Sequence, residues 1–436
     1  MARAGRARTP FPPLFWIGNI IEVLERLAYY GLYMGFQVYA TTALAAGGLG
    51  WGKGQLGIVQ TLFLILSYGV PLISGILADR YGFKRMLLVS FVLYLPGFLF
   101  LVVTRQFLLV LLVMALIGIA AGVFKPLIAG TVRLTTDDSS RTLGFGIFYQ
   151  MVNIGAFIGP LVAGALRTIT WNYAFLMSAS AVVVMIFVTL AGYRDPIEPD
   201  RSEDRPSLTQ DLKEIVPFLK DPKILGFILI FGIFIEVPFW AFFNLIAVFA
   251  DTQVGMDLLY VSFSEVLGET VVGWISTTDV DGVPRIAGET MSHTALWIIL
   301  FQLMVTGTTE RMRSLPTISL GVLIMALGCV ALWLAPGPYP ALLFLGSFLF
   351  AIGEMACMPR FEQYLISLLP PEKTGLGGGL LRIPVVIGAF SGVTLTPLYG
   401  VFEARGVPGA IWLVVGGSLI IGLVGLLLYD RVFRPA

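Results

Sequence analysis

Long apolar runs separated by short polar segments dominate the chain, and each run is roughly 20 residues long or longer. A helix of about 20 apolar residues crosses the hydrocarbon core of a bilayer, whereas a strand of a membrane barrel alternates apolar and polar positions over about ten residues. The pattern therefore predicts an all-α, polytopic membrane protein with twelve transmembrane helices. The predicted spans are 14–46, 54–78, 85–104, 107–132, 141–166, 171–192, 222–250, 292–310, 315–335, 340–370, 376–402 and 407–431.

A polar, proline-containing stretch divides these spans into six and six. We expect an N-terminal six-helix bundle at 1–192, a cytoplasmic linker with one short amphipathic helix at 193–221, and a C-terminal six-helix bundle at 222–436. The second bundle carries a long, acidic extracytoplasmic insertion at about 251–291. β-Branched residues flank an Asp-Gly pair in this insertion, which is a weak hairpin signal. The insertion is interpreted as a solvated cap, or alternatively as an element that takes part in gating or attracts cations.

Composition supports a lipid environment and argues against several classes of function. Hydrophobic residues make up 57% of the chain and charged residues only 13%, against about 25% charged residues in soluble domains. The net charge of +1 gives no sign of a nucleic-acid partner. The single histidine, His293, and two cysteines within apolar runs predict no metal, no cofactor and no enzymatic site.

The distribution of basic residues predicts the orientation of the chain in the membrane. If both termini are cytoplasmic, the inner segments hold 19 Lys and Arg residues and the outer loops hold five. Basic residues concentrate on the cytoplasmic side of membrane proteins. We therefore expect a multi-pass protein of the cell's inner or plasma membrane, a monomer, with a retained first helix and both termini in the cytoplasm.

One motif lies in the predicted inner loop between the second and third spans. It resembles the loop signature of the major facilitator superfamily, in which glycines permit a tight reversal and close helix approach. A carboxylate there can accept hydrogen bonds from a helix N-terminus, where the helix dipole favours an anion. The motif is therefore expected to act in gating. Its key residues are Gly75, Asp79, Arg80, Gly82, Lys84 and Arg85.

A second motif places three ionisable residues inside the first span. At 100° per residue they share one face, about 100° wide, with two tyrosines. Charges in a membrane helix are costly and rare, so this face is expected to line a cavity. The alternative is a buried ion-pair cluster that only holds the helix in place. The five residues of this polar face are Glu22, Glu25, Arg26, Tyr29 and Tyr33.

Several segments resemble the proton-dependent oligopeptide transporter family. Residues 22–30 match its E-x-x-E-R-F-x-Y-Y signature, except that Leu27 stands where the family has Phe. Residues 148–157, FYQMVNIGAF, are similar to its span-five signature. Weaker similarities are the Lys125-Pro126 pair, the segment FWA at 239–241 and the pair Gly353-Glu354. The likeness extends over most of both halves of the chain.

This resemblance implies a central cavity with two charged poles. Arg26 and Lys125 would hold the carboxylate of a substrate, and Glu354 would receive its amino group. Glu22, Glu25 and Arg26 would take part in proton coupling. The remaining substrate-binding residues implied by the resemblance are Tyr29, Tyr30, Tyr68, Asn153, Trp240 and Asn244.

Two features depart from the family pattern. The family's span-seven acid is replaced by Asn244, and Glu236, two turns earlier, is expected to substitute for it in proton coupling. Arg360 and Glu362 follow Glu354 on the tenth span, where they either reshape the substrate pocket or pair near the inner mouth.

The sequence therefore favours a proton-coupled secondary active importer of short peptides or peptide-like solutes that works by alternating access. The alternative is a major facilitator transporter of another solute, such as an organic anion or a drug, or an exporter. A receptor or a membrane-embedded enzyme fits less well, because neither an output domain nor a nucleophile–base pair is evident.

Overall fold

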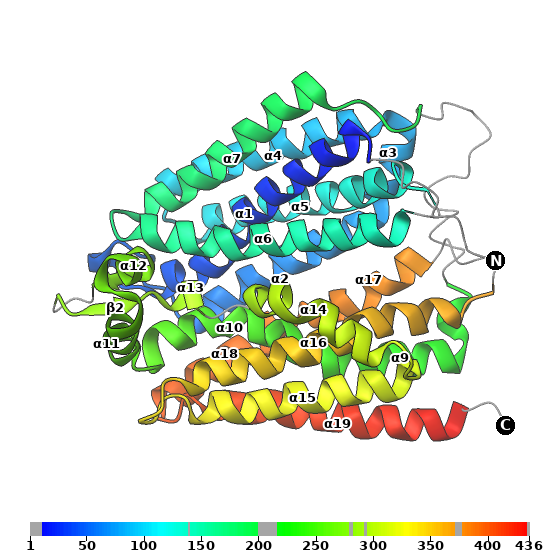
Figure 1. Ribbon diagram of the computed structural model, residues 1–436. Coiled ribbons are helices and arrows are strands. Elements are labelled where there is room, and N and C mark those ends of the chain that lie inside the picture. Colours follow the sequence, from blue (N-terminus) through cyan, green and yellow to red (C-terminus); the bar gives the residue numbers. More distant parts are fainter. Residues whose placement is uncertain are drawn as a thin grey trace, which may run out of the picture.

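The computed structural model describes residues 11–137, 140–198, 216–278, 282–291, 294–370 and 377–433. The described part is almost entirely helical (Figure 1). The first half of the chain forms α1 (Pro13–Thr41), α2 (Lys53–Gly69), α3 (Pro71–Tyr81), α4 (Phe83–Val103), α5 (Phe107–Leu134), α6 (Arg141–Arg167) and α7 (Trp171–Gly192), with one 3₁₀ turn at Leu44–Ala46.

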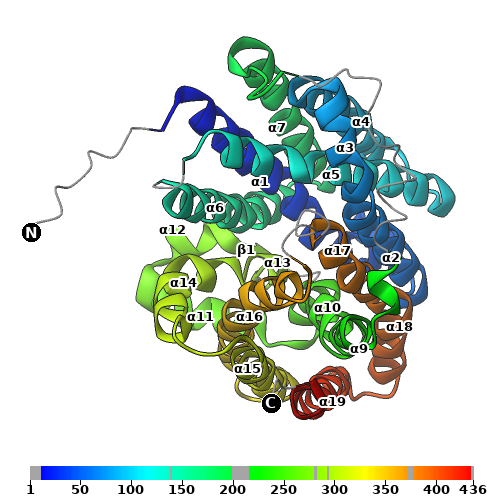
Figure 2. The same ribbon diagram turned by 90° about the vertical axis from the view of Figure 1, so that its right-hand side faces the viewer.

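The second half begins with a 3₁₀ turn at Phe218–Lys220 and has its own set of long helices. These are α9 (Pro222–Phe231), a π-helical turn at Gly232–Glu236, α10 (Val237–Gln253), α14 (Ala295–Thr309), α15 (Ser314–Leu334), α16 (Leu342–Ser367), α17 (Gly377–Gly388), α18 (Ser391–Ala404) and α19 (Ala410–Phe433). Figure 2 shows α1 and α4–α7 gathered on one side and α9, α10 and α14–α19 on the other, with α2 beside α17 and α18. Most of the predicted linker, 199–215, lies outside the described residues, and the division into two domains stays a prediction.

The helices confirm the predicted fold class. Within the described part, eleven helices are long and apolar enough to cross a membrane. Helix α1 is 29 residues long but carries three ionisable residues. With α1, the helices account for each predicted span, and the chain is an all-α, multi-pass integral membrane protein. The predicted end of the first span, residue 46, was wrong: α1 ends at Thr41, and Gly47 in the following turn has a left-handed φ of 81°.

Three of the predicted spans are interrupted. The span at 376–402 divides into α17 and α18 between Gly388 and Ser391, and the other two are interrupted beside a proline that the sequence contains. The span predicted at 54–78 divides into α2 and α3 at Pro71, and the span at 222–250 has a π-helical turn just before Pro238. Proline has no backbone N–H and its ring crowds the preceding turn, so the regular hydrogen-bond ladder cannot continue through it.

The insertion is folded rather than extended. It contains α11 (Met256–Leu267), α12 (Glu269–Val272), a 3₁₀ turn at Gly273–Ile275, strands β1 (Ser276–Thr278) and β2 (Pro284–Ile286), and α13 (Gly288–Met291). The strands pair antiparallel with Thr277 opposite Arg285, which confirms the hairpin signal. These elements cover one end of the helix bundle, called the insertion end below (Figure 1).

A buried ion cluster ties the insertion to the first half of the chain. Arg167, the last residue of α6, donates to an oxygen of Glu289 at 3.0 Å and to Asp251 at 3.1 Å. Arg285 on β2 lies 3.5 Å from the same Asp251 carboxylate and donates to the main-chain oxygen of Asp251. Glu289 is fully buried, while Glu265 on α11 is exposed, as a solvated cap requires. Only part of the acidic insertion is therefore solvated.

We predict that Arg167→Ala lowers the thermal unfolding temperature of the purified protein. The change leaves the Glu289 carboxylate buried without its arginine, which costs about 3–5 kcal/mol in comparable cases. The double variant Arg167→Leu, Glu289→Leu should recover much of the loss, because it removes both charges. Arg405→Ala, at an exposed arginine beyond α18, is the matched control. Equal unfolding temperatures for Arg167→Ala and Arg405→Ala would show that the cluster does not hold the insertion in place.

Candidate functional site

The polar face of α1 is buried in the protein. Glu22, Glu25 and Arg26 are at most 6% exposed. The Nε of Arg26 lies 3.1 Å from Glu22 Oε1, and its Nη2 lies 2.5 Å from Glu25 Oε2. The other oxygen of Glu25 accepts a hydrogen bond from the Tyr94 hydroxyl at 2.5 Å. One arginine therefore faces two carboxylates, and the group has an excess of negative charge while both are ionised.

A small residue on α6 lets this helix approach the polar face closely. A Cβ atom on Gly155 would lie 2.5 Å from the Val23 carbonyl oxygen and 2.6 Å from Arg26 Cβ. Helix backbones can come this close only where one side chain is absent. Asn153, two residues earlier on α6, donates its amide to the Tyr149 carbonyl at 2.8 Å and is buried. The span-five motif thus packs α6 directly on the face that carries Arg26.

Lys125 is positioned by a proline and a glycine on α5. Pro126 has no N–H for the Gly122 carbonyl, which instead accepts a hydrogen bond from Ser74 on α3 at 3.0 Å. A Cβ on Gly122 would lie 2.6 Å from Val70 Cβ and 2.7 Å from the Leu66 carbonyl oxygen. Helix α5 therefore lies against the α2–α3 break, and this contact brings Lys125 to the side chain of Tyr68.

The ammonium group of Lys125 has aromatic neighbours but no hydrogen-bond partner among the described residues. Its Nζ atom is buried and lies 3.5 Å from the centre of the Tyr68 ring and 4.9 Å from that of Tyr29. The guanidinium of Arg26 also lies near Tyr29, 5.2 Å from the centre of its ring. Cation–π contacts stabilise a cation only partly, so Lys125 can bind an anion without first giving up an ion pair.

Glu354 lies on α16, in the second half of the chain. One of its oxygens accepts a hydrogen bond from Thr294 at 3.2 Å. It lies within electrostatic reach of Tyr30 on α1 and Tyr149 on α6. The structure thus gives its carboxylate a hydroxyl donor but no ion pair among the described residues.

A pocket of about 200 Å³ adjoins these groups on the second-half side. It is lined by Tyr68 from α2 and by Glu236, Trp240, Glu362 and Arg382, among others. The Tyr68 and Trp240 rings lie 5.0 Å apart and join the two halves. The sequence predicted roles for Glu236 and Trp240 but none for Arg382, because its position at this pocket depends on how α17 packs.

Arg360 and Asn244, the two departures from the family pattern, have other partners. Arg360 donates to the Thr309 carbonyl at 2.6 Å and to Gln363 at 3.0 Å, rather than to Glu362. Asn244 is fully buried in the seam between the halves. It accepts a hydrogen bond from Tyr33 at 2.5 Å and donates one to Ser391 at 2.9 Å.

The predicted gating motif links the end of α3 to the start of α4. Gly82 has a φ of 93°, a conformation that glycine adopts readily. The backbone N–H of Lys84 donates to Asp195 beyond α7 at 2.6 Å, and its side chain reaches the Leu190 carbonyl at 3.3 Å. Gly75 lies near Pro126 on α5, while Asp79 and Arg80 are exposed. The motif thus contacts α5 and the end of α7.

Comparisons with known proteins agree with this architecture. The chain is 30% identical to the uncharacterized transporter YclF of Bacillus subtilis over 168 residues, which is 38% of this chain and 34% of the relative. It is 27% identical to a di-/tripeptide transporter of Lactococcus lactis over 224 residues, or 48% of this chain and 44% of the relative. The matched part thus spans about a third to just under half of these relatives.

The fold is also similar to that of a solved structure over nearly its whole length. A crystal structure of the peptide transporter POT in complex with alafosfalin superposes with a TM-score of 0.76 at 21% identity, covering 98% of this chain and 96% of that one. The family model described as Major Facilitator Superfamily matches residues 27–288, which is more than half of the chain. With its many membrane-spanning helices and buried polar centre, this chain belongs to the major facilitator superfamily of transporters.

Proposed function

We propose that this transporter is a proton-coupled importer of short peptides or peptide-like solutes that carry both an amino group and a carboxylate. The observation that carries the proposal is the buried Lys125 ammonium, which has no hydrogen-bond partner among the described residues and lies beside the same tyrosine as Arg26. A buried cation without an anion is costly at membrane depth. A substrate carboxylate would supply the missing partner.

The second half of the chain offers the complementary charge. Glu354 on α16 would receive the substrate's amino group, so one substrate would contact both halves at once. Aromatic rings from both halves, Tyr68 and Trp240, would pack against the substrate body. Binding near the middle of the membrane between two halves is typical of secondary transporters, and closure of the halves around the substrate would produce alternating access.

The carboxylates of α1 provide a means of proton coupling. While Glu22 and Glu25 are ionised, both hold Arg26. Carboxyl groups removed from water bind protons more readily than exposed ones. A proton on Glu25 would weaken the Glu25–Arg26 pair and release the guanidinium for the substrate carboxylate. Glu236, buried and near two further acids, would be a second proton-binding group.

The similarity to di-/tripeptide transporters supports a peptide-like substrate. We assign the motif at Gly75–Arg85 to gating, since its Lys84 ties α4 to the end of α7. The orientation with both termini cytoplasmic follows from the bias of the basic residues.

The two-pole cavity predicts how chemical blocking of a substrate weakens its binding. In a competition series with alanyl-alanine, the free peptide should bind best, and its C-terminal amide and N-acetyl forms should each bind about tenfold or more weakly, because each loses a charged hydrogen bond. Glu354→Gln should remove most of the penalty for acetylation, whereas Glu265→Gln, at an exposed acid on α11 of the insertion, should not. Equal affinity for all three forms would contradict the two-pole model and favour another solute.

Proton coupling predicts that a gradient drives uptake. In proteoliposomes, the initial rate of alanyl-alanine uptake should rise with an inward proton gradient. Glu25→Gln removes one of the two proposed proton-binding groups and should reduce this stimulation, while counterflow without a gradient persists. Asp257→Asn, at an exposed acid of the insertion, is the control. Wild-type uptake that is the same with and without the gradient would argue against coupling.

A further inference from the structure

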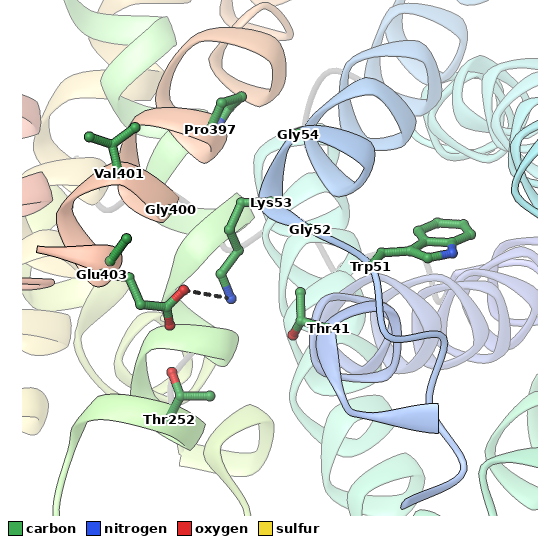
Figure 3. Close-up of a pocket in the computed structure, with 11 residues that line it drawn as sticks. Thr41, Trp51, Gly52, Lys53, Gly54, Thr252, Pro397, Gly400, Val401 and Glu403 are labelled. Carbon is green, nitrogen blue, oxygen red and sulfur yellow. Dashed lines mark ion pairs between the residues drawn. The ribbon is translucent and has the colours of Figure 1, made fainter. Parts of the chain in front are cut away.

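A second, larger pocket opens at the insertion end of the bundle, between α2 and α18 (Figure 3). Its volume is about 610 Å³, within the range of about 300–1,000 Å³ common for sites that bind small molecules. Figure 3 shows Lys53 and Glu403 facing each other across it, with Thr41 beside the Lys53 ammonium and Thr252 below the Glu403 carboxylate in this view. The lining comes from both halves of the chain, since α1 and α2 face α10 and α18.

Lys53 and Glu403 form a loose ion pair across this pocket. Their Nζ and Oε2 atoms are 3.5 Å apart, whereas charged N–H···O hydrogen bonds are typically about 2.7–2.9 Å long. The Lys53 ammonium also lies 5.2 Å from the Tyr399 ring. The other oxygen of Glu403 accepts a hydrogen bond from Gln253 at 3.0 Å. Gln253 thus holds the Glu403 carboxylate independently of Lys53.

The N-terminus of α2 adds a second anion-binding feature on the Lys53 side. Gly52, Lys53 and Gly54 line the pocket, and the first turn of this 17-residue helix contains no acidic residue. Cβ atoms on Gly52 or Gly54 would meet nothing within 4 Å, so the space beside the turn is open. Helix N-termini present free N–H groups and the positive end of the helix dipole. A carboxylate here would meet both this turn and the Lys53 ammonium.

A tight contact between α2 and α18, called the seam here, separates the pocket from the residues around Lys125. A Cβ on Gly57 would lie 2.1 Å from the Gly392 carbonyl oxygen, so the backbones of α2 and α18 are in contact one turn below Lys53. One turn further, Thr61 donates to the Ala389 carbonyl at 3.0 Å. A solute bound between Lys53 and Glu403 would therefore lie outside the closed seam, on the path to Lys125.

We propose that this pocket is an entry site for the same class of dipolar solute, with the carboxylate bound by Lys53 and the α2 N-terminus and the amino group bound by Glu403. The proposal rests on the proposed function, because it takes the cargo to carry both charges. The solute replaces the Lys53–Glu403 pair with two separate ion pairs, which removes a direct link between the halves. Binding at the entrance would thereby loosen the seam that bars the route to the central cavity.

The test measures binding of alanyl-alanine to the full-length protein in lipid nanodiscs by saturation-transfer NMR. The double variant Arg26→Ala, Lys125→Ala removes the central cations and leaves the outer pocket intact. If thermal unfolding shows that this double variant is misfolded, the single variant Lys125→Met, which keeps the side-chain volume, is used in its place. Lys53→Gln and Glu403→Gln are then introduced into this background, and Arg405→Gln removes a nearby charge that does not line the pocket.

Alanyl-alanine should still receive saturation in the central-site variant, and Lys53→Gln or Glu403→Gln should weaken that binding about tenfold, as expected for a lost charged hydrogen bond. Arg405→Gln should leave it unchanged. The charge swap Lys53→Glu, Glu403→Lys should regain any thermal stability that the single variants lose, because it keeps an ion pair. It should not regain binding, because a carboxylate would then occupy the α2 N-terminus. Restored binding in the swap would identify the pair as a simple link between the halves and overturn the proposal.

The remaining outcomes separate this proposal from the proposed function. If the wild type binds alanyl-alanine and the central-site variant does not, the entry site is wrong and the central site stands. If binding depends on Lys53 and Glu403 but not on Arg26 and Lys125, the entry site stands and the central assignment fails. Binding that none of the four residues affects contradicts both.

Discussion

Charged side chains at membrane depth must find partners, and the arrangement of this protein follows from how those partners are supplied. Arg26 meets Glu22 and Glu25 on its own helix, and Tyr94 completes the hydrogen bonding of Glu25. Among the residues that the structure describes, Lys125 has only the faces of two tyrosines as partners. Of these two cations, Arg26 has a carboxylate partner in the described structure and Lys125 does not. A substrate carboxylate would supply the anion that Lys125 lacks.

The same constraint explains why the halves touch where they do. Polar groups from α1 and α2 bond with α10 and α18, as in the Tyr33–Asn244 contact and the contact between Gln60 and the Asn244 carbonyl. Backbone contact at Gly57 and Gly392 closes the seam near the insertion end. Each bond is modest in strength, so a conformational cycle can break the seam one group at a time, provided that a substrate or water satisfies the groups released.

Periodicity predicted the helices and the hairpin of the insertion, because these are local properties of short segments. Pro71 and Pro238 also indicate the α2–α3 break and the π-helical turn. The prediction missed both interruptions because each proline lies within a long apolar run that was taken as one continuous helix. Other features depend on residues far apart in the chain. The pairing of Arg167 with Glu289, the position of Arg382 at a pocket and the burial of Asn244 between the halves arise from tertiary packing, and no local pattern marks them.

The assignment of Lys125 as a substrate carboxylate site is tested most directly by a double-mutant cycle measured by calorimetry. Alanyl-alanine and its C-terminal amide are each titrated into the wild type and into Lys125→Met. The account predicts a coupling free energy of about 1.5–3 kcal/mol between the lysine and the carboxylate, the range for hydrogen bonds between charged groups. The amide would then bind the variant almost as well as the free peptide does. The same preference for the free peptide in both proteins, with a coupling near zero, would contradict the account.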